Sequence, residues 1–219
     1  MRIIVHPGHN PDGKVACGAV GILRESTCAR NIVNEIKRLC PNIEVFSVED
    51  GKNQQDVLNK IVERVNSSNY GLSISVHLNA ANTDAAEGVE AYVWNPGNTT
   101  GIAYKVASKW LNKMEKLGYR NRGIKWGQTL KVIKSTNCPS ILLECGFVTN
   151  QRDCNLFNAT EIAKAIIESC GLKQEEIQED TPEAPRYRVI AGAFKSKDNA
   201  QSFLKAVKMH YPDAYIQEV

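Results

Sequence analysis

The sequence predicts an α/β fold: an open, mostly parallel sheet with helices on both faces, followed by a small βαβ segment at the C-terminus. Short apolar runs rich in β-branched residues alternate with longer segments whose apolar residues recur at helical spacing. An acidic stretch near residue 180 separates this alternation from a shorter strand–helix–strand pattern. The 219 residues suffice for one large domain and one small one.

The first strand is predicted at residues 3–5, where Ile-Ile-Val breaks into Pro7 and Gly8 between two histidines. Further apolar runs end in residues that favour turns and predict strands at residues 43–48, 71–77, 88–94, 130–133 and 140–145. The periodicity predicts helices over residues 25–39, 53–65 and 100–114, and one within 153–170. Strands that alternate with helices in this way form a largely parallel sheet that is covered on both faces.

Composition excludes several classes of protein. A net charge of +3 is too small to indicate a nucleic-acid partner, and no apolar run is long enough to cross a membrane. Only three strongly apolar residues precede His6, so we expect no signal peptide and synthesis in the cytoplasm. The seven cysteines are scattered without a Cys-x-x-Cys pair, which favours reduced, mostly buried thiols over disulfides.

Charge divides the chain into three parts. Residues 1–172 contain the alternating strands and helices and form the predicted large domain. Residues 173–185 contain one Lys, five acidic residues and no aromatic residue, so they bury little apolar surface and are predicted to form a linker. Residues 186–219 are basic again and contain the strand–helix–strand pattern.

Polar residues follow three of the predicted strands. His9 and His77 lie at strand ends, and Glu144 interrupts the apolar run of residues 140–145. Two imidazoles and a carboxylate make a three-ligand zinc site, and a further carboxylate is needed to take a proton from water. Glu25 is the fourth candidate, although an acid there also suits the start of a helix. A strand-end histidine is more often structural, whereas an unpaired carboxylate in an apolar run is costly and indicates function.

Five motifs together resemble the zinc-dependent N-acetylmuramoyl-L-alanine amidases of the amidase-3 type, which include endolysins of phages. They are PGH at 7–9, GAVGILRES at 18–26, SVHLNAA at 75–81, RGIK at 122–125 and PSILLECGFVTN at 139–150. The resemblance implies one zinc ion on His9, Glu25 and His77, with Glu144 as the catalytic carboxylate. The implied reaction is hydrolysis of the amide between the lactyl group of N-acetylmuramic acid and L-alanine, and hence lysis of the bacterial cell wall.

The resemblance has departures. The family commonly has an acid at the position of His6 and a second glycine at the position of Asn10. We interpret His6 either as a residue that orients the metal-bound His9 or as an ordinary strand-end histidine. Asn79 either orients His77 or contacts the substrate.

The sequence argues against two alternative functions, a cysteine hydrolase and a nucleotide-binding module. Cys145 as a nucleophile lacks a specified histidine partner, and strand alternation turns it away from Glu144. A nucleotide-binding module needs a glycine-rich phosphate loop after a strand, which residues 18–26 do not provide. The alternative from another class is an inactive peptidoglycan-binding protein. The presence of both histidines, His9 and His77, and both glutamates, Glu25 and Glu144, argues against it.

Residues 186–219 resemble one half of a SPOR domain, a family that binds the glycan strands of peptidoglycan. About 34 residues are too few to bury a core alone. We therefore expect this segment to pair with the same segment of a second chain in a homodimer; docking on the catalytic domain and disorder are the alternatives. Without a signal peptide, we expect the protein to reach the wall by one of two routes. Either a phage holin opens the membrane, or a sporulating mother cell lyses and releases the protein.

Overall fold

The computed structural model describes residues 1–83, 85–174, 194–208, 211, 214 and 216 of the chain. The chain divides into two compact units, Met1–Glu176 and Ile177–Val219. Most of the predicted acidic linker and most residues of the two predicted tail strands lie outside the described residues. The predicted domain boundaries at 172 and 185 therefore stay predictions.

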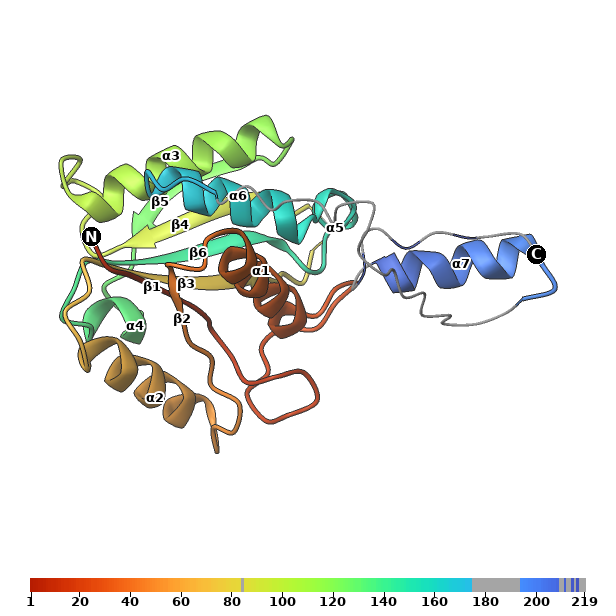
Figure 1. Ribbon diagram of the computed structural model, residues 1–219. Helices are drawn as coiled ribbons and strands as arrows, with labels where there is room; N and C mark the ends of the chain where they lie inside the picture. Colours follow the sequence, from red (N-terminus) through yellow and green to blue (C-terminus); the bar gives the residue numbers. More distant parts are fainter. Residues whose placement is uncertain (84, 175–193, 209–210, 212–213, 215, 217–219) are drawn as a thin grey trace, which may run out of the picture. The chain divides into compact units, whose positions relative to one another are not determined.

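The first unit is built on one six-stranded sheet (Figure 1). In spatial order its strands are β2 (Glu44–Val45), β1 (Ile3–Pro7), β3 (Leu72–Asn79), β6 (Ser140–Phe147), β4 (Val89–Val93) and β5 (Asn121–Trp126). The first four strands are mutually parallel, whereas β4 runs antiparallel to β6 and parallel to β5. The predicted open, mostly parallel sheet is confirmed.

Helices cover both faces of the sheet, as the sequence predicts (Figure 1). One face carries α1 (Glu25–Leu39), α3 (Ile102–Lys116) and α6 (Ala159–Ser169), with the short α5 (Gln151–Leu156) preceding α6. The opposite face carries α2 (Gln54–Asn66) and the short α4 (Lys131–Lys134). The apolar residues that recur in α1, α3 and α6 pack on the sheet in one large core, and those of α2 and α4 form a smaller core on the other face.

Two expectations about elements are wrong or incomplete. Residues 130–133 do not form a strand, because Leu130 begins a helical turn in which Lys134 donates to its carbonyl oxygen. The strand β5 was not predicted, since its sequence NRGIKW mixes charge with a glycine. The helix expected within 153–170 is confirmed as α6; the side chain of Asn158 caps it by accepting a hydrogen bond from the amide of Glu161, and the short α5 precedes it.

Strand alternation sorts the side chains of the central strands onto two faces. Leu143 and Cys145 of β6 point into the large core, so Leu142 and Glu144 point to the face that carries α2 and α4. On β3 the large core takes the apolar alternate residues, so His77 shares the face of Glu144. His77 and Glu144 therefore lie on the face of the sheet that carries the smaller core.

In the second unit the described residues include one helix, α7 (Lys197–Lys208). Ser196 precedes it, and its hydroxyl accepts a hydrogen bond from the amide of Asn199, as the side chain of an N-cap residue does. The side chains of Ala200, Leu204 and Val207 are half-buried along one stripe. Over the described residues, no helix combines the length and apolarity that spanning a membrane requires.

The loop after β1 is locked by the side chain of Asn10. Its amide nitrogen donates to the carbonyl oxygens of Val15 and Gly51, each at 2.7 Å, and its carbonyl oxygen accepts from the amide of Gly51 at 2.9 Å. The side chain is fully buried, so each of these bonds replaces contact with water. Asn10 thereby joins the loop that follows His9 to the segment before α2.

We expect Asn10→Ala to lower the free energy of unfolding of the first unit by about 2–4 kcal/mol, because it leaves buried carbonyl and amide groups unpaired. The change is measured in denaturant by tryptophan fluorescence. All three tryptophans, 94, 110 and 126, lie in this unit, and Trp110 is fully buried. The exposed Asn155→Ala is the control, with a change within about 0.5 kcal/mol. Equal stabilities for the two variants would contradict this account.

Candidate functional site

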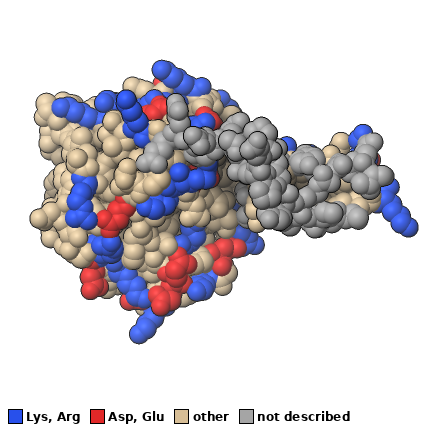
Figure 2. All heavy atoms as spheres, in the orientation of Figure 1, with Lys and Arg blue, Asp and Glu red and all other residues tan. Residues whose placement is uncertain are grey.

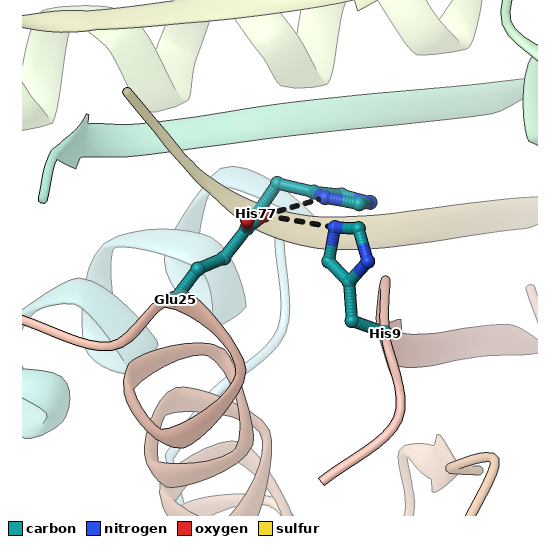
Figure 3. Close-up of side chains that lie close together, drawn as sticks. All are labelled: His9, Glu25 and His77. Atoms are coloured by element: carbon teal, nitrogen blue, oxygen red, sulfur yellow. Dashed lines mark hydrogen bonds and ion pairs between the residues drawn. The ribbon is translucent and has the colours of Figure 1, made fainter. Parts of the chain in front are cut away.

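Three predicted ligands converge at the carboxyl ends of β1 and β3. The oxygen Oε1 of Glu25 lies 2.9 Å from Nδ1 of His77 and 3.1 Å from Nε2 of His9 (Figure 3). The two imidazole rings meet edge to face, with centroids 4.9 Å apart. His9 comes from the loop after β1, His77 from β3 and Glu25 from the first turn of α1, so three separate segments supply the cluster.

Two glycines allow this close approach. A Cβ atom on Gly8 would lie 1.7–2.5 Å from atoms of the His77 ring. A Cβ atom on Gly18 would lie 2.5 Å from Oε2 of Glu25 and 2.8 Å from the ring of His9, and Gly18 also has a positive φ of 81°. The glycines of the PGH and GAVGILRES motifs are therefore required by the geometry of the cluster.

Hydrogen bonds hold Glu25 as an anion. Burial raises the pKa of its carboxyl, but hydrogen bonds from His77 and His9 outweigh burial and bring the pKa below its usual range. Its second oxygen accepts from the amide of Ala19 at 2.8 Å. Burial lowers the pKa of His9, and the contact with Glu25 more than reverses this effect. The carboxylate is thus negative and fixed where the two rings meet.

The donor set fits a metal ion. The candidate ligand atoms of His9, Glu25 and His77 lie within 4.8 Å of one another. Ligand atoms about 2.0–2.1 Å from a tetrahedral zinc ion are about 3.3 Å apart, close to the observed separations from Glu25. The remaining ring nitrogen of His77, Nε2, lies 3.1 Å from the hydroxyl oxygen of Ser75, so one ring nitrogen is free to ligate.

Arg30 of α1 fixes the backbone that carries His9. Its guanidinium donates to the carbonyl oxygens of His9 at 2.8 Å and Val48 at 2.6 Å, and pairs with Glu49 at 2.7 Å. Its side chain is 17% exposed, so these bonds are largely shielded from water. Through Arg30, α1 positions His9 as well as Glu25.

Glu144 lies on β6, paired in the ladder with His77 of β3. Its Oε2 is buried and has no hydrogen-bond partner among the described residues. Burial, with the charges of Glu25 and Glu90, raises the pKa of Glu144 to about 8, and Lys125 acts in the opposite direction. The carboxyl group is therefore close to the metal-binding cluster, unsatisfied, and able to exchange a proton near neutral pH.

Sequence reasoning missed a second buried carboxylate, Glu90 of β4, which lies directly opposite Glu144 in the antiparallel ladder. Its side chain is 2% exposed and is paired with Arg122 and Lys125 of β5. A single charged residue in the apolar run VEAYV was the available signal. The RGIK motif supplies both of its cations.

The remaining predicted residues have contacts of their own. Asn79 donates to Glu90 at 3.1 Å and not to His77. His6 is fully buried, its Nδ1 lies 3.3 Å from the carbonyl oxygen of Pro7, and Nε2 has no partner among the described residues. Burial lowers the pKa of His6 to about 4. Cys145 is buried in the large core, on the face opposite Glu144.

Comparisons with known proteins match both units. The family model for N-acetylmuramoyl-L-alanine amidase matches residues 3–171, and the SPOR domain model matches residues 157–218. The SPOR match begins before the predicted start at 186 and shares residues 157–171 with the amidase match. The structure includes α6, within that overlap, in the first unit, where it contributes to the large core.

Two curated relatives are each 30% identical to this chain. One is an uncharacterised cell wall amidase of Bacillus anthracis, matched over 166 residues, and the other is the N-acetylmuramoyl-L-alanine amidase LytC of Bacillus subtilis, matched over 158. Each match covers 69% of this chain but only 30% of the relative.

Solved structures show the same fold. The catalytic domain of the CD27L endolysin that targets Clostridia difficile superimposes with a TM-score of 0.64 at 23% identity. The match covers 78% of this chain and 96% of that domain. With the family model matching 3–171 of 219 residues, this chain belongs to the N-acetylmuramoyl-L-alanine amidase family.

Proposed function

We propose that this protein is a zinc-dependent peptidoglycan hydrolase that cleaves the amide between the lactyl group of N-acetylmuramic acid and the L-alanine of the stem peptide. The observation that carries this proposal is the convergence of His9, Glu25 and His77 beside Glu144, whose Oε2 has no hydrogen-bond partner among the described residues. Membership of the amidase family supports the same reaction. An inactive wall-binding protein would have no use for a glutamate with a buried, unpaired oxygen next to a metal-binding cluster.

His9 and His77 would hold the zinc ion with Glu25 as the third ligand. Bound zinc supplies Lewis acidity, polarising a carbonyl group and making water a better acid. Arg30 and Ser75 keep the two imidazoles in place through the His9 carbonyl and the second His77 nitrogen. The three protein ligands leave room for water and substrate, as in catalytic zinc sites.

Glu144 would move the protons. As a carboxylate it accepts a proton from the attacking water, and as a carboxylic acid it gives that proton to the departing alanine nitrogen. The pKa near 8 allows both forms at neutral pH. We assign these transfers to Oε2, which has no hydrogen-bond partner among the described residues.

The tail would bind the wall. The SPOR match supports binding of glycan strands by residues of the second unit, and we propose that two copies pair through it. Among the described residues of that unit, Phe203 and Phe194 are 40% and 45% exposed, with ring centroids 5.1 Å apart. Apolar surface of this kind is suited to contact between copies. Release to the wall by phage lysis or by lysis of a sporulating mother cell fits both proposals.

Zinc analysis with wall-cleavage assays tests the catalytic proposal. We expect about one zinc ion per chain in the wild type and in Glu144→Gln, and loss of zinc in His77→Ala. The wild type should release peptides with an N-terminal alanine from purified walls, and His77→Ala should release none. Glu144→Gln should be slower than the wild type by about 10²–10⁴-fold because it cannot carry a proton. A wild type that holds no zinc yet binds walls would overturn the amidase proposal.

Gly8→Ala tests the cluster without removing a ligand. The added methyl group would collide with the His77 ring, so we expect zinc affinity to fall by about 10–100-fold, as when the support of a ligand is lost. Zinc affinity is measured by competition with a chelator. Gly97→Ala is the matched control, since its Cβ would meet only the side-chain oxygen of Asn95, at 3.1 Å. Unchanged affinity in folded Gly8→Ala would show that the His77 ring can move freely.

Phe203→Lys tests pairing through the tail. We expect the wild type to sediment as a dimer, and Phe203→Lys to shift it to monomer, because a charge replaces an aromatic contact. The exposed Lys205→Gln on the same helix is the control. Sedimentation of the wild type as a monomer at all concentrations would rule out the homodimer.

A further inference from the structure

The carboxylate of Glu90 is surrounded by four donors on the face that Glu144 shares. Its Oε1 accepts hydrogen bonds from Tyr92 at 2.7 Å and Asn79 at 3.1 Å. Its Oε2 accepts from Lys125 at 2.5 Å and Arg122 at 2.6 Å. A buried carboxylate with two cations is fixed as an anion, so Glu90 has no proton to exchange and differs in this respect from Glu144.

The two cations are more accessible than the anion that holds them. The side chains of Arg122 and Lys125 are 29% and 37% exposed, against 2% for Glu90. Arg122 also lies over the ring of Phe147, with its guanidinium carbon 5.0 Å from the ring centroid. Glu90 neutralises only one of these two partly exposed cations. Such a pair, fixed by a buried carboxylate and an aromatic ring, is suited to binding an anionic group.

The strand order places these groups in a line. The ligands His9 and His77 belong to the β1 and β3 segments, Glu144 to β6, Glu90 to β4 and the two cations to β5. The ladder pairs Glu90 directly with Glu144, which puts their side chains on one face about 5 Å apart at Cβ. The effect of Lys125 on the pKa of Glu144 reflects the same proximity.

We propose that Arg122 and Lys125 bind a carboxylate of the stem peptide, on the leaving-group side of the scissile amide, and so make the enzyme selective for acidic peptides. The proposal rests on the proposed function. Because Glu144 gives its proton to the alanine nitrogen, that nitrogen must lie at β6, and the peptide continues from it. The metal cluster occupies the β1 and β3 side, so the peptide extends towards β4 and β5.

The distances suit the residue after the alanine. Neighbouring strands are about 4.8 Å apart, so β5 lies about 10 Å from β6, and Lys125 reaches back as far as Glu90. An extended peptide advances about 3.5 Å per residue. The second residue of the peptide therefore lies close enough for its carboxyl group to reach the two cations. This carboxyl group is either the side-chain one or the main-chain one.

Cleavage of two matched compounds tests this inference. One is N-acetylmuramoyl-L-alanyl-D-glutamate, and the other is the same compound with both glutamyl carboxyl groups converted to amides. The full-length wild type, Lys125→Gln, Arg122→Gln and the control Lys109→Gln are compared by kcat/KM. Lys109 is an exposed lysine of α3, on the face opposite Glu144.

We expect the wild type and Lys109→Gln to prefer the acidic compound by about tenfold or more, the worth of one charge-assisted hydrogen bond. Lys125→Gln and Arg122→Gln should lose this preference through a higher KM for the acidic compound, while each still cleaves the diamide. Cleavage of the diamide shows that these variants are folded and active. A wild type without preference, or variants that retain it, would overturn the inference.

Binding of the released peptide separates this inference from the proposed function. Calorimetry with L-alanyl-D-glutamate and its diamide needs no cleavage. We expect the wild type to bind the acidic dipeptide about tenfold more tightly than Lys125→Gln does. If the wild type cleaves neither compound, the proposed function fails, and equal dipeptide binding by the two proteins would then reject the cation site independently.

Discussion

A single carboxylate oxygen joins the three segments of the site. Oε1 of Glu25 contacts both His9 and His77, and the amide of Leu78 also lies 3.3 Å from it. The first turn of α1 must therefore meet the ends of β1 and β3, which requires α1 to pack firmly on the sheet. The buried residues of α1 provide that packing in the large core. The position of the site thus depends on helix–sheet packing as much as on its ligands.

Two glutamates face each other across β4 and β6 and have opposite properties. Glu90 is saturated with donors and held as an anion, since hydrogen bonds from Arg122, Lys125 and Tyr92 overcome the effect of burial on its pKa. Glu144 lacks such partners, and the negative charge of Glu90 helps to raise its pKa. Two residues of the same type thus have different roles, one as an acid–base group and one as a fixed anion, because their neighbours differ.

Much of this arrangement is predictable from the sequence, because apolar periodicity marks the buried elements and polar residues at the ends of apolar runs stand out. His77 and Glu144 both interrupt such runs. The role of Glu90 is harder to predict for two reasons. It depends on β5, whose charged residues make it hard to recognise as a strand, and on the antiparallel direction of β4. The misread segment at 130–133 shows a related limit: four residues are too few to distinguish a strand from a helical turn.

Arg30 has a consequence for how this sequence can diverge. It grips the loop through the main-chain oxygens of His9 and Val48, groups that every amino acid carries. The exposed side chain of Asp12, which pairs with Arg24 and not with Arg30, can therefore be exchanged without loosening these bonds. The sequence of this loop can therefore vary without moving the metal ligands. Relatives could adapt the loop to cell walls of different composition while the metal-binding cluster stays unchanged.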